Sequence, residues 1–141
     1  MWPTSFPERL AGWKNLRMTC QDLDVQTALE QINAWWFGTP WQPYYLHWDD
    51  VETWPDPWAL LSDDVYCDLA RSLGIMYTIS MLERQDLADA ELIMSQNGHN
   101  LVSVSQSKYI LNWSPDTVVN TSSDIQIQRS LKLSEIAQKY E

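Results

Sequence analysis

The chain has 141 residues, which is enough for one compact domain and too few for two. Nine Lys and Arg residues oppose 19 Asp and Glu residues, a formal net charge of −10, so nucleic acid is not an expected partner, because phosphate backbones repel an acidic surface. Apolar runs are only a few residues long and the start has neither a basic region nor an apolar stretch, so we expect no membrane span, no signal peptide and a cytoplasmic location.

The N-terminal part, residues 1–58, is predicted to be helical and rich in Trp. Pro7 suits the first turn of a short helix. Residues 22–36 form a stronger candidate helix, because apolar residues recur at i, i+3, i+4 and i+7. Asp22 or Asp24 can cap it.

Residues 37–58 form a connection rich in Pro and Trp, beginning with the helix-ending residues Gly38 and Pro40. Residues 44–48 are a candidate short strand. Pro57 is placed to start a helical turn that runs through Leu61.

A second long helix is predicted from Ser62 to about Arg84. Ser62 is a good N-cap, and the acidic residues after it suit the helix dipole. Gly74 lies inside the pattern and costs roughly 1 kcal/mol relative to Ala, so a small side chain there indicates the close approach of another element. This assignment places Cys67 more than one turn inside the helix.

Three strands are predicted next, as an antiparallel meander. Residues 91–96 and 99–105 flank Asn97-Gly98, the strongest short hairpin signal, and residues 109–113 follow a turn at 107–108. The tail, residues 124–141, alternates with period two and then becomes helical. It is expected either to add a strand and a helix to the fold or to dock on a partner.

The predicted fold class is α+β, with the N-terminal helices and the Cys67 helix packed on a three-stranded antiparallel sheet. Residues 1–123 are expected to form a single domain, whose core of helix and meander spans residues 59–115, and residues 124–141 form a separate C-terminal segment. Nine tryptophans are unusual at this length; most of them are expected to pack in the core, and the excess could include a docking surface, since Trp is enriched at interfaces.

Cys67, His99 and Asn112 are the residues that could carry chemistry. Thiol catalysis needs a thiolate, a base that generates it and a third group that orients the base. A Cys on a helix, followed by a His and an Asn on adjacent strands, can supply these three roles if the strand register brings them together. Each also has a structural interpretation: a buried Cys, a polar turn residue, and an Asn that satisfies local backbone.

Other kinds of site are not expected. Cys20 and Cys67 could form one disulfide, but nothing indicates a disulfide framework. His47 is a second candidate base, yet two Cys and two His residues in unrelated spacings do not predict zinc. The acidic residues near positions 49 and 63 have no calcium-loop spacing. No cofactor is predicted.

The chain resembles the transglutaminase-like superfamily, in particular its bacterial cysteine-proteinase-like branch, over about residues 53–113. The residues that carry the resemblance are Asp56-Pro57-Trp58, Cys67-Asp68-Leu69-Ala70, His99-Asn100-Leu101-Val102 and Ile110-Leu111-Asn112. The resemblance implies that Cys67 is the nucleophile, His99 the base and Asn112 the orienting residue. Val65-Tyr66 stand where that branch has Gly-Asp, and bulky side chains there are expected to crowd the thiol.

A second resemblance concerns small proteins of contractile-tailed cyanobacterial phages. It is carried by Trp35-Trp36, His47-Trp48-Asp49 and the run from Trp54 to Trp58 followed by Tyr66-Cys67. It implies a virion component, such as part of a tail or baseplate.

Three hypotheses follow from the sequence. The leading one is a non-catalytic interaction or assembly protein with a degenerate transglutaminase-like fold, virion-associated if the second resemblance holds, with protein partners. The alternative is a cysteine hydrolase or acyltransferase that uses Cys67, His99 and Asn112. A regulator that binds a host protein through its acidic surface is the third.

Overall fold

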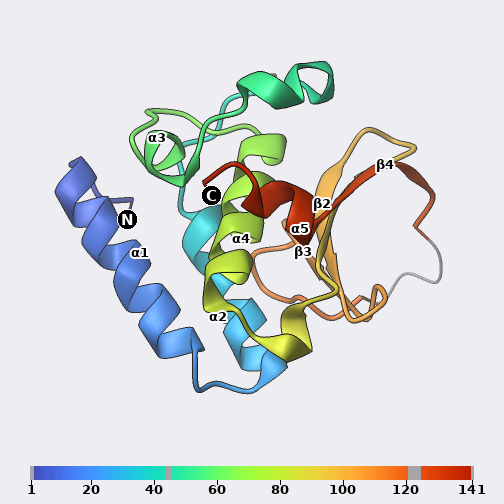
Figure 1. Cartoon of the computed structure of the whole chain (residues 1–141), viewed down its shortest axis with the longest axis horizontal. Coiled ribbons are helices and arrows are strands. Elements are labelled where there is room, and N and C mark those ends of the chain that lie inside the picture. The colour runs from blue at the N-terminus through green and yellow to red at the C-terminus, as the bar shows by residue number, and fades with distance from the viewer. Residues whose placement is uncertain (1, 44–45, 121–124, 141) are drawn as a thin grey trace.

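The computed structural model describes residues 2–43, 46–120 and 125–140, and these form an α+β fold. Helices α1 (Phe6–Cys20) and α2 (Val25–Phe37) lie on one side of the central helix α4 (Asp68–Leu82). An antiparallel sheet lies on the other side, and Figure 1 shows α4 between the two layers. The α+β class predicted from the sequence is confirmed.

Both N-terminal helices begin at side-chain caps. Ser5 accepts a hydrogen bond from the N–H of Glu8, with Pro7 in the first turn of α1. Asp24 accepts one from the N–H of Thr27 at the start of α2, and hydrogen bonding from the side chain and then the backbone of Thr27 lowers the pKa of Asp24. The helices predicted around Pro7 and over residues 22–36 are therefore confirmed, and α1 is longer than the short helix predicted.

The helix predicted from Ser62 begins later than expected. Helix α3 (Pro57–Leu61) ends with Ser62 as its C-cap, and α4 does not start until Asp68. The chain between them is held extended, because the N–H of Tyr66 donates to Pro40 O and Tyr66 O accepts from Gln42 N. The predicted helix start at Ser62 was therefore wrong. Backbone pairing of Tyr66 with a distant segment keeps the chain extended, although Ser62 would be a good N-cap.

Gly74 allows α2 and α4 to pack closely, as its place in the sequence pattern suggested. A Cβ added at Gly74 would lie 2.5 Å from the ring of Trp36, far inside a normal contact. The Trp36 indole N–H also donates to Thr78 Oγ1, 3.0 Å away and one turn along α4. The ring is thus packed and hydrogen-bonded at once.

The sheet has four strands in the order β3-β2-β1-β4, so the prediction of three strands is corrected. Strands β1 (Glu91–Ser95), β2 (Asn100–Val104) and β3 (Tyr109–Leu111) form the predicted meander. The turn between β1 and β2 contains Gly98, whose φ is +85°. Strand β4 (Ile127–Lys132) pairs antiparallel with β1. Its neighbour in the sheet is more than 30 residues away in sequence, so local patterns could not assign it.

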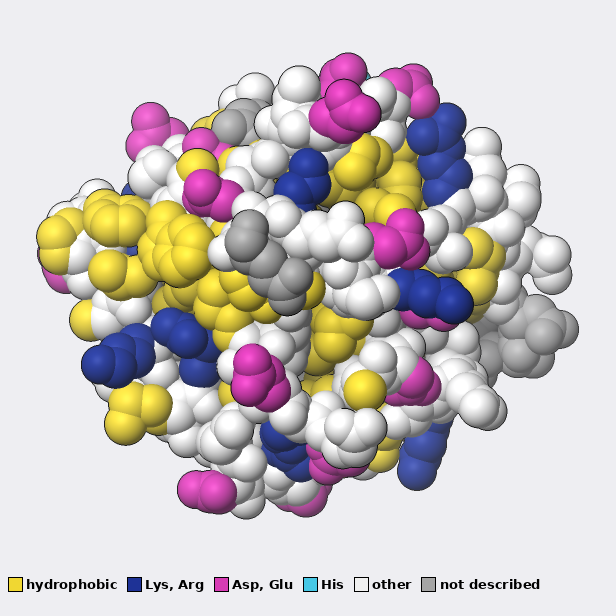
Figure 2. Space-filling view, in the orientation of Figure 1, with side chains coloured by type: hydrophobic (Ala, Val, Ile, Leu, Met, Phe, Trp, Pro, Cys, Tyr) yellow, Lys and Arg dark blue, Asp and Glu magenta, His cyan; other side chains and the backbone are white. Residues whose placement is uncertain are grey.

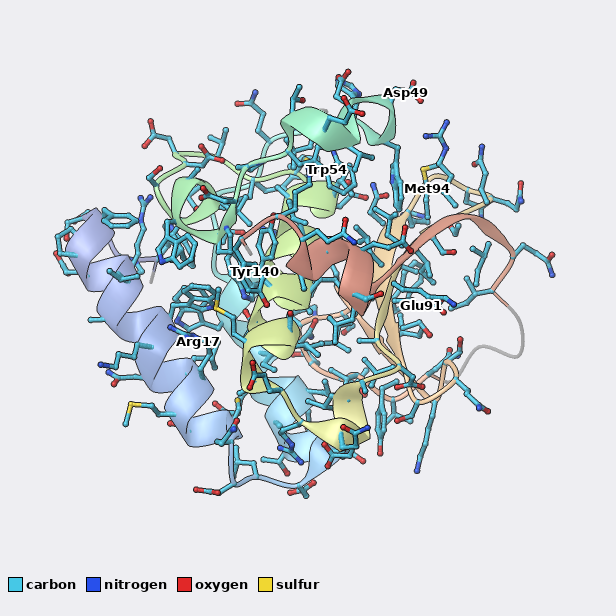
Figure 3. All side chains as sticks on the ribbon, in the orientation of Figure 1. Arg17, Asp49, Trp54, Glu91, Met94 and Tyr140 are labelled. Atoms are coloured by element: carbon cyan, nitrogen blue, oxygen red, sulfur yellow. The ribbon has the colours of Figure 1, made fainter. Side chains whose placement is uncertain are left out.

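The C-terminal segment is part of the same core. Helix α5 (Leu133–Ala137) follows β4 directly, packs on α4 and buries Ile136, which is 1% exposed. Tyr140, labelled in Figure 3, packs its ring edge-on to Tyr77 of α4. Of the two alternatives for the tail, the added strand and helix is the one observed.

Two short 3₁₀ helices complete the fold, η1 (Trp48–Thr53) and η2 (Gln85–Leu87). Residues 46–48 are not a strand, so that part of the strand predicted over 44–48 is wrong. Positions 44–45 lie outside the described residues. Among the described residues, no helix combines the length and apolar character that crossing a membrane requires.

The two faces of the sheet differ. Val102 and Val104 of β2 face α4 and belong to the main core. Leu101, which precedes them and faces the other way, belongs with Ile93 and Ile110 to a small separate cluster on the outer face. No described helix packs against this outer face, and residues 113–120 and 125–126 run beside it.

Candidate functional site

Cys67 is the N-cap residue of α4. Its Sγ accepts hydrogen bonds from the backbone N–H groups of Ala70 and Leu46, both at 3.4 Å, and the residue is only 2% exposed. Cys67 was predicted to lie inside a helix, and this is corrected: the thiol stands at the positive end of the helix dipole. Its sulfur performs the role that Ser or Asp usually has at a helix start.

Asp68, the first residue of α4, ties the helix to the sheet. Its two carboxylate oxygens accept from the backbone N–H and the side-chain amide of Asn100, each at 3.1 Å. Asn100 Oδ1 in turn accepts from the indole N–H of Trp48 at 2.7 Å. The polar groups beside the thiol are therefore satisfied by one another, as buried polar groups require.

Asn112 has a structural environment that fits Asn closely. Its backbone is left-handed, with φ +67°, a conformation that Asn tolerates better than most residues. Its side-chain amide N–H₂ faces three acceptors: Asp68 O at 2.8 Å, Ser72 Oγ at 3.0 Å and Asn100 O at 3.0 Å. These contacts join the end of β3 to α4 and β2, and none of them involves a histidine.

His99 belongs to the other side of the sheet. It precedes β2 by one residue, so its side chain points away from that of Asn100, as neighbours on a strand do. Its imidazole is exposed and stands edge-on to the Trp113 indole, with ring centroids 5.3 Å apart and planes at 89°. His99 lines a hollow on the outer face, whereas Cys67 lines a different one.

The structure therefore brings Cys67 and Asn112 to the same end of α4 but leaves His99 outside. Asn100, not His99, faces the start of the helix, a difference of one position along the strand. Because side chains alternate, one position decides the face. Val102 and Val104 could have signalled that Asn100 shares the core side, but Leu101 is equally apolar and hid the alternation.

The hollow beside Cys67 measures about 280 Å³ and is lined by both apolar and charged side chains. Asp49 of η1 and Met94 of β1, both labelled in Figure 3, lie on its wall. His47 and Arg129 also line it, and Arg129 forms a 3.1 Å ion pair with Asp49. Tyr66, which the sequence predicted to crowd the thiol, instead packs its ring against Trp2 and Trp36.

The second hollow measures about 470 Å³ and lies on the outer face of the sheet. Its floor is the apolar cluster of Leu101 and Ile110 with Ile125, and Trp113, 63% exposed, stands beside it. This site was not predicted from the sequence. The signal for it was Leu101, an apolar residue on the face of β2 opposite Val102 and Val104.

Cys20 has no part in either hollow. It is fully buried where α1 ends, and burial raises the pKa of its thiol. Both cysteines are free, so the one disulfide considered from the sequence is not formed. Within residues 2–43, 46–120 and 125–140, no three His, Cys, Asp or Glu side chains gather closely enough to hold a metal ion.

Comparison of the chain with family models, curated proteins and solved structures finds no match. The resemblances to transglutaminase-like proteins and to phage proteins therefore rest on the quoted residues alone and remain predictions.

Proposed function

We propose that this protein is a non-catalytic interaction and assembly protein, with a tailed-phage virion as the assembly that its sequence resemblance favours. The observation that carries the proposal is the state of Cys67. Its sulfur accepts two backbone N–H groups, it is 2% exposed, and the side chains around it bond to one another. A nucleophile needs a free approach and a base within hydrogen-bond reach.

A surface suited to a protein partner lies on helices α1 and α3. Helices α1 and α3 contact each other, and we call their side chains Phe6, Leu10 and Trp58 the α1–α3 patch. Phe6 is 36% and Trp58 is 43% exposed, and Figure 2 shows apolar side chains gathered over this corner. Exposed aromatic side chains are the usual anchors of protein interfaces.

Alkylation of the native protein tests the non-catalytic part. The Cys20→Ser variant leaves Cys67 as the single thiol, and Cys67→Ser leaves Cys20. With iodoacetamide at neutral pH we expect both variants to react slowly when folded and fully in urea, because both thiols are buried. Rapid labelling of native Cys20→Ser protein would contradict the proposal.

Site-specific cross-linking tests the interaction part. A benzophenone side chain at position 6 or 58 should capture a protein partner in an extract of the native source, whereas the same group at Glu30, exposed on α2, should not. The captured protein, once purified, should bind the Phe6→Ala/Trp58→Ala variant at least about tenfold more weakly than the unmodified chain. Equal binding, or cross-linking only at position 30, would refute the patch as the interface.

The alternative, a cysteine hydrolase or acyltransferase, is favoured by one observation. Cys67 stands at a helix N-terminus and shares its hollow with His47, so His47 would replace His99 as the base. In that case His47→Ala would slow alkylation of Cys67 strongly, and His99→Ala would not. Equal rates in both variants would exclude this assignment.

A further inference from the structure

The hollow on the outer face of the sheet has the form of a small-molecule site. Strands supply its floor and the segment after β3 supplies its outer wall, through residues such as Thr117 and Val119. Its volume of about 470 Å³ lies within the range of about 300–1,000 Å³ that ligand sites occupy. A hollow of this size is concave, unlike the broad surfaces that protein partners cover.

The chemistry of the lining selects the ligand. None of the described residues that line the hollow has an Asp, Glu, Lys or Arg side chain, although 28 residues of the chain do. Burying an ion without a partner is costly, so an uncharged ligand is favoured. The hollow beside Cys67, by contrast, holds two carboxylates and a guanidinium.

The shape of the ligand follows from the apolar and aromatic groups. Leu101 and Ile110 are almost fully buried and form a floor with no polar side chain, while the rings of His99 and Trp113 form an aromatic corner. Flat rings pack well against such a corner. The amides of Gln96, Asn97 and Gln126 at the rim can donate and accept hydrogen bonds.

We infer that the outer-face hollow binds a small, uncharged molecule with a flat apolar ring system. The inference is independent of the α1–α3 patch and of the state of Cys67, because it uses none of their residues. The expected ligand has an apolar body that packs on the floor and a neutral polar edge that faces the amides of the rim. It is a site on the sheet face that α4 does not cover.

Two dyes that share one ring system provide the test. N-phenyl-1-naphthylamine is uncharged, and 8-anilino-1-naphthalenesulfonate carries a sulfonate on a similar skeleton. We expect the uncharged dye to bind with a rise in fluorescence, and the sulfonate to bind at least about tenfold more weakly at moderate salt. Absence of binding by the uncharged dye would overturn the inference.

Variants locate the dye. Val119→Trp, at a residue 39% exposed on the wall, should fill the hollow and abolish binding, and Trp113→Ala should weaken it. Trp41→Ala is the matched control, because Trp41 is 58% exposed and outside the hollow. If Val119→Trp fails to fold, the comparison of dye binding by Trp113→Ala and Trp41→Ala still tests the site. Equal loss in these two variants would refute the site.

NMR gives an independent readout. Amide shifts on adding the uncharged dye should concentrate at Leu101, Ile110 and the Trp113 indole. Shifts concentrated at Phe6 and Trp58 would show that the dye only covers the exposed α1–α3 patch, and the inference would fail.

Discussion

Asn112 shows how one side chain separates a structural role from a catalytic one. As the orienting member of a triad it could be replaced by Asp, since either side chain can accept a hydrogen bond from the imidazole N–H. In the structure its amide N–H₂ faces two backbone carbonyls, Asp68 O and Asn100 O, together with Ser72 Oγ. A carboxylate in that place would face the carbonyl oxygens without an N–H or O–H group to donate to them.

Asn112→Asp is therefore expected to destabilise the protein by about 1–3 kcal/mol or more, because it leaves buried acceptors unsatisfied and brings a negative charge against them. Urea unfolding measures the change. Asn97→Asp, an exposed turn residue with the same change of charge, should alter stability by less than about 0.5 kcal/mol. Equal effects at the two positions would show that Nδ2 of Asn112 contributes nothing.

Gly74 gives a second prediction at this scale. Gly74→Ala should gain about 1 kcal/mol in helix propensity, yet its Cβ would lie 2.5 Å from the Trp36 ring. We expect a net loss of about 1–3 kcal/mol in the free energy of unfolding, because overpacking forces α2 and α4 apart.

Gly12→Ala is the matched control, since a Cβ there makes only ordinary contact with Trp35 at 3.7 Å. That variant should be as stable as the parent or up to about 1 kcal/mol more stable. If Gly74→Ala also gained stability, the close packing of the two helices would not be a constraint.

At the scale of elements, the sequence predicted what is encoded locally. Asp24 capped a periodic apolar run, and Asn97-Gly98 joined two strands, so α2 and the β1–β2 hairpin were predicted correctly. The start of α4 and the presence of β4 were not. Both depend on pairing with segments far away in sequence, Pro40 and Gln42 in one case and β1 in the other.

The face on which His99 lies could not be predicted, for a related reason. A shift of one position along the strand puts His99 on the outer face of the sheet. Leu101 makes that face apolar too, so the pattern of apolar residues in this short strand did not settle the choice.

The C-terminal elements offer a prediction at this scale. Ile136→Ala should lower the free energy of unfolding by about 2–5 kcal/mol, because Ile136 is 1% exposed between α5 and the core. The better helix propensity of Ala offsets only a small part of this loss. Ile127→Ala in β4, where the side chain is 45% exposed, is the control and should cost less than about 1 kcal/mol. Denaturant midpoints compare the two. Similar costs would mean that α5 docks only loosely on α4.

For the whole molecule, charge and aromatic content have separate consequences. Of the nine Trp residues, Trp2, Trp13, Trp36 and Trp54 are buried in the main core, so part of the apparent excess is ordinary packing. Trp41, Trp58 and Trp113 are largely exposed, on different elements. The latter two stand in the two surfaces to which we assign binding, and Trp41 pairs through its backbone with Tyr66.

The net charge of −10 predicts how stability responds to salt. The described residues hold two ion pairs, Arg84–Asp86 and Arg129–Asp49, each with a largely exposed carboxylate, so added salt has little attraction to weaken. Repulsion among the excess carboxylates is long-ranged and is screened as the Debye length falls from about 10 Å at 0.1 M to about 3 Å at 1 M. The melting temperature should therefore rise with NaCl.

Differential scanning calorimetry over about 0.02–0.5 M NaCl measures this rise. Most of it should occur below about 0.2 M, where screening changes fastest, and choline chloride should reproduce it because the effect depends on ionic strength and not on the cation. A melting temperature that fell in this range would mean that the attraction within the two ion pairs exceeds the repulsion among the excess carboxylates. A rise confined to higher salt would instead indicate strengthened apolar burial.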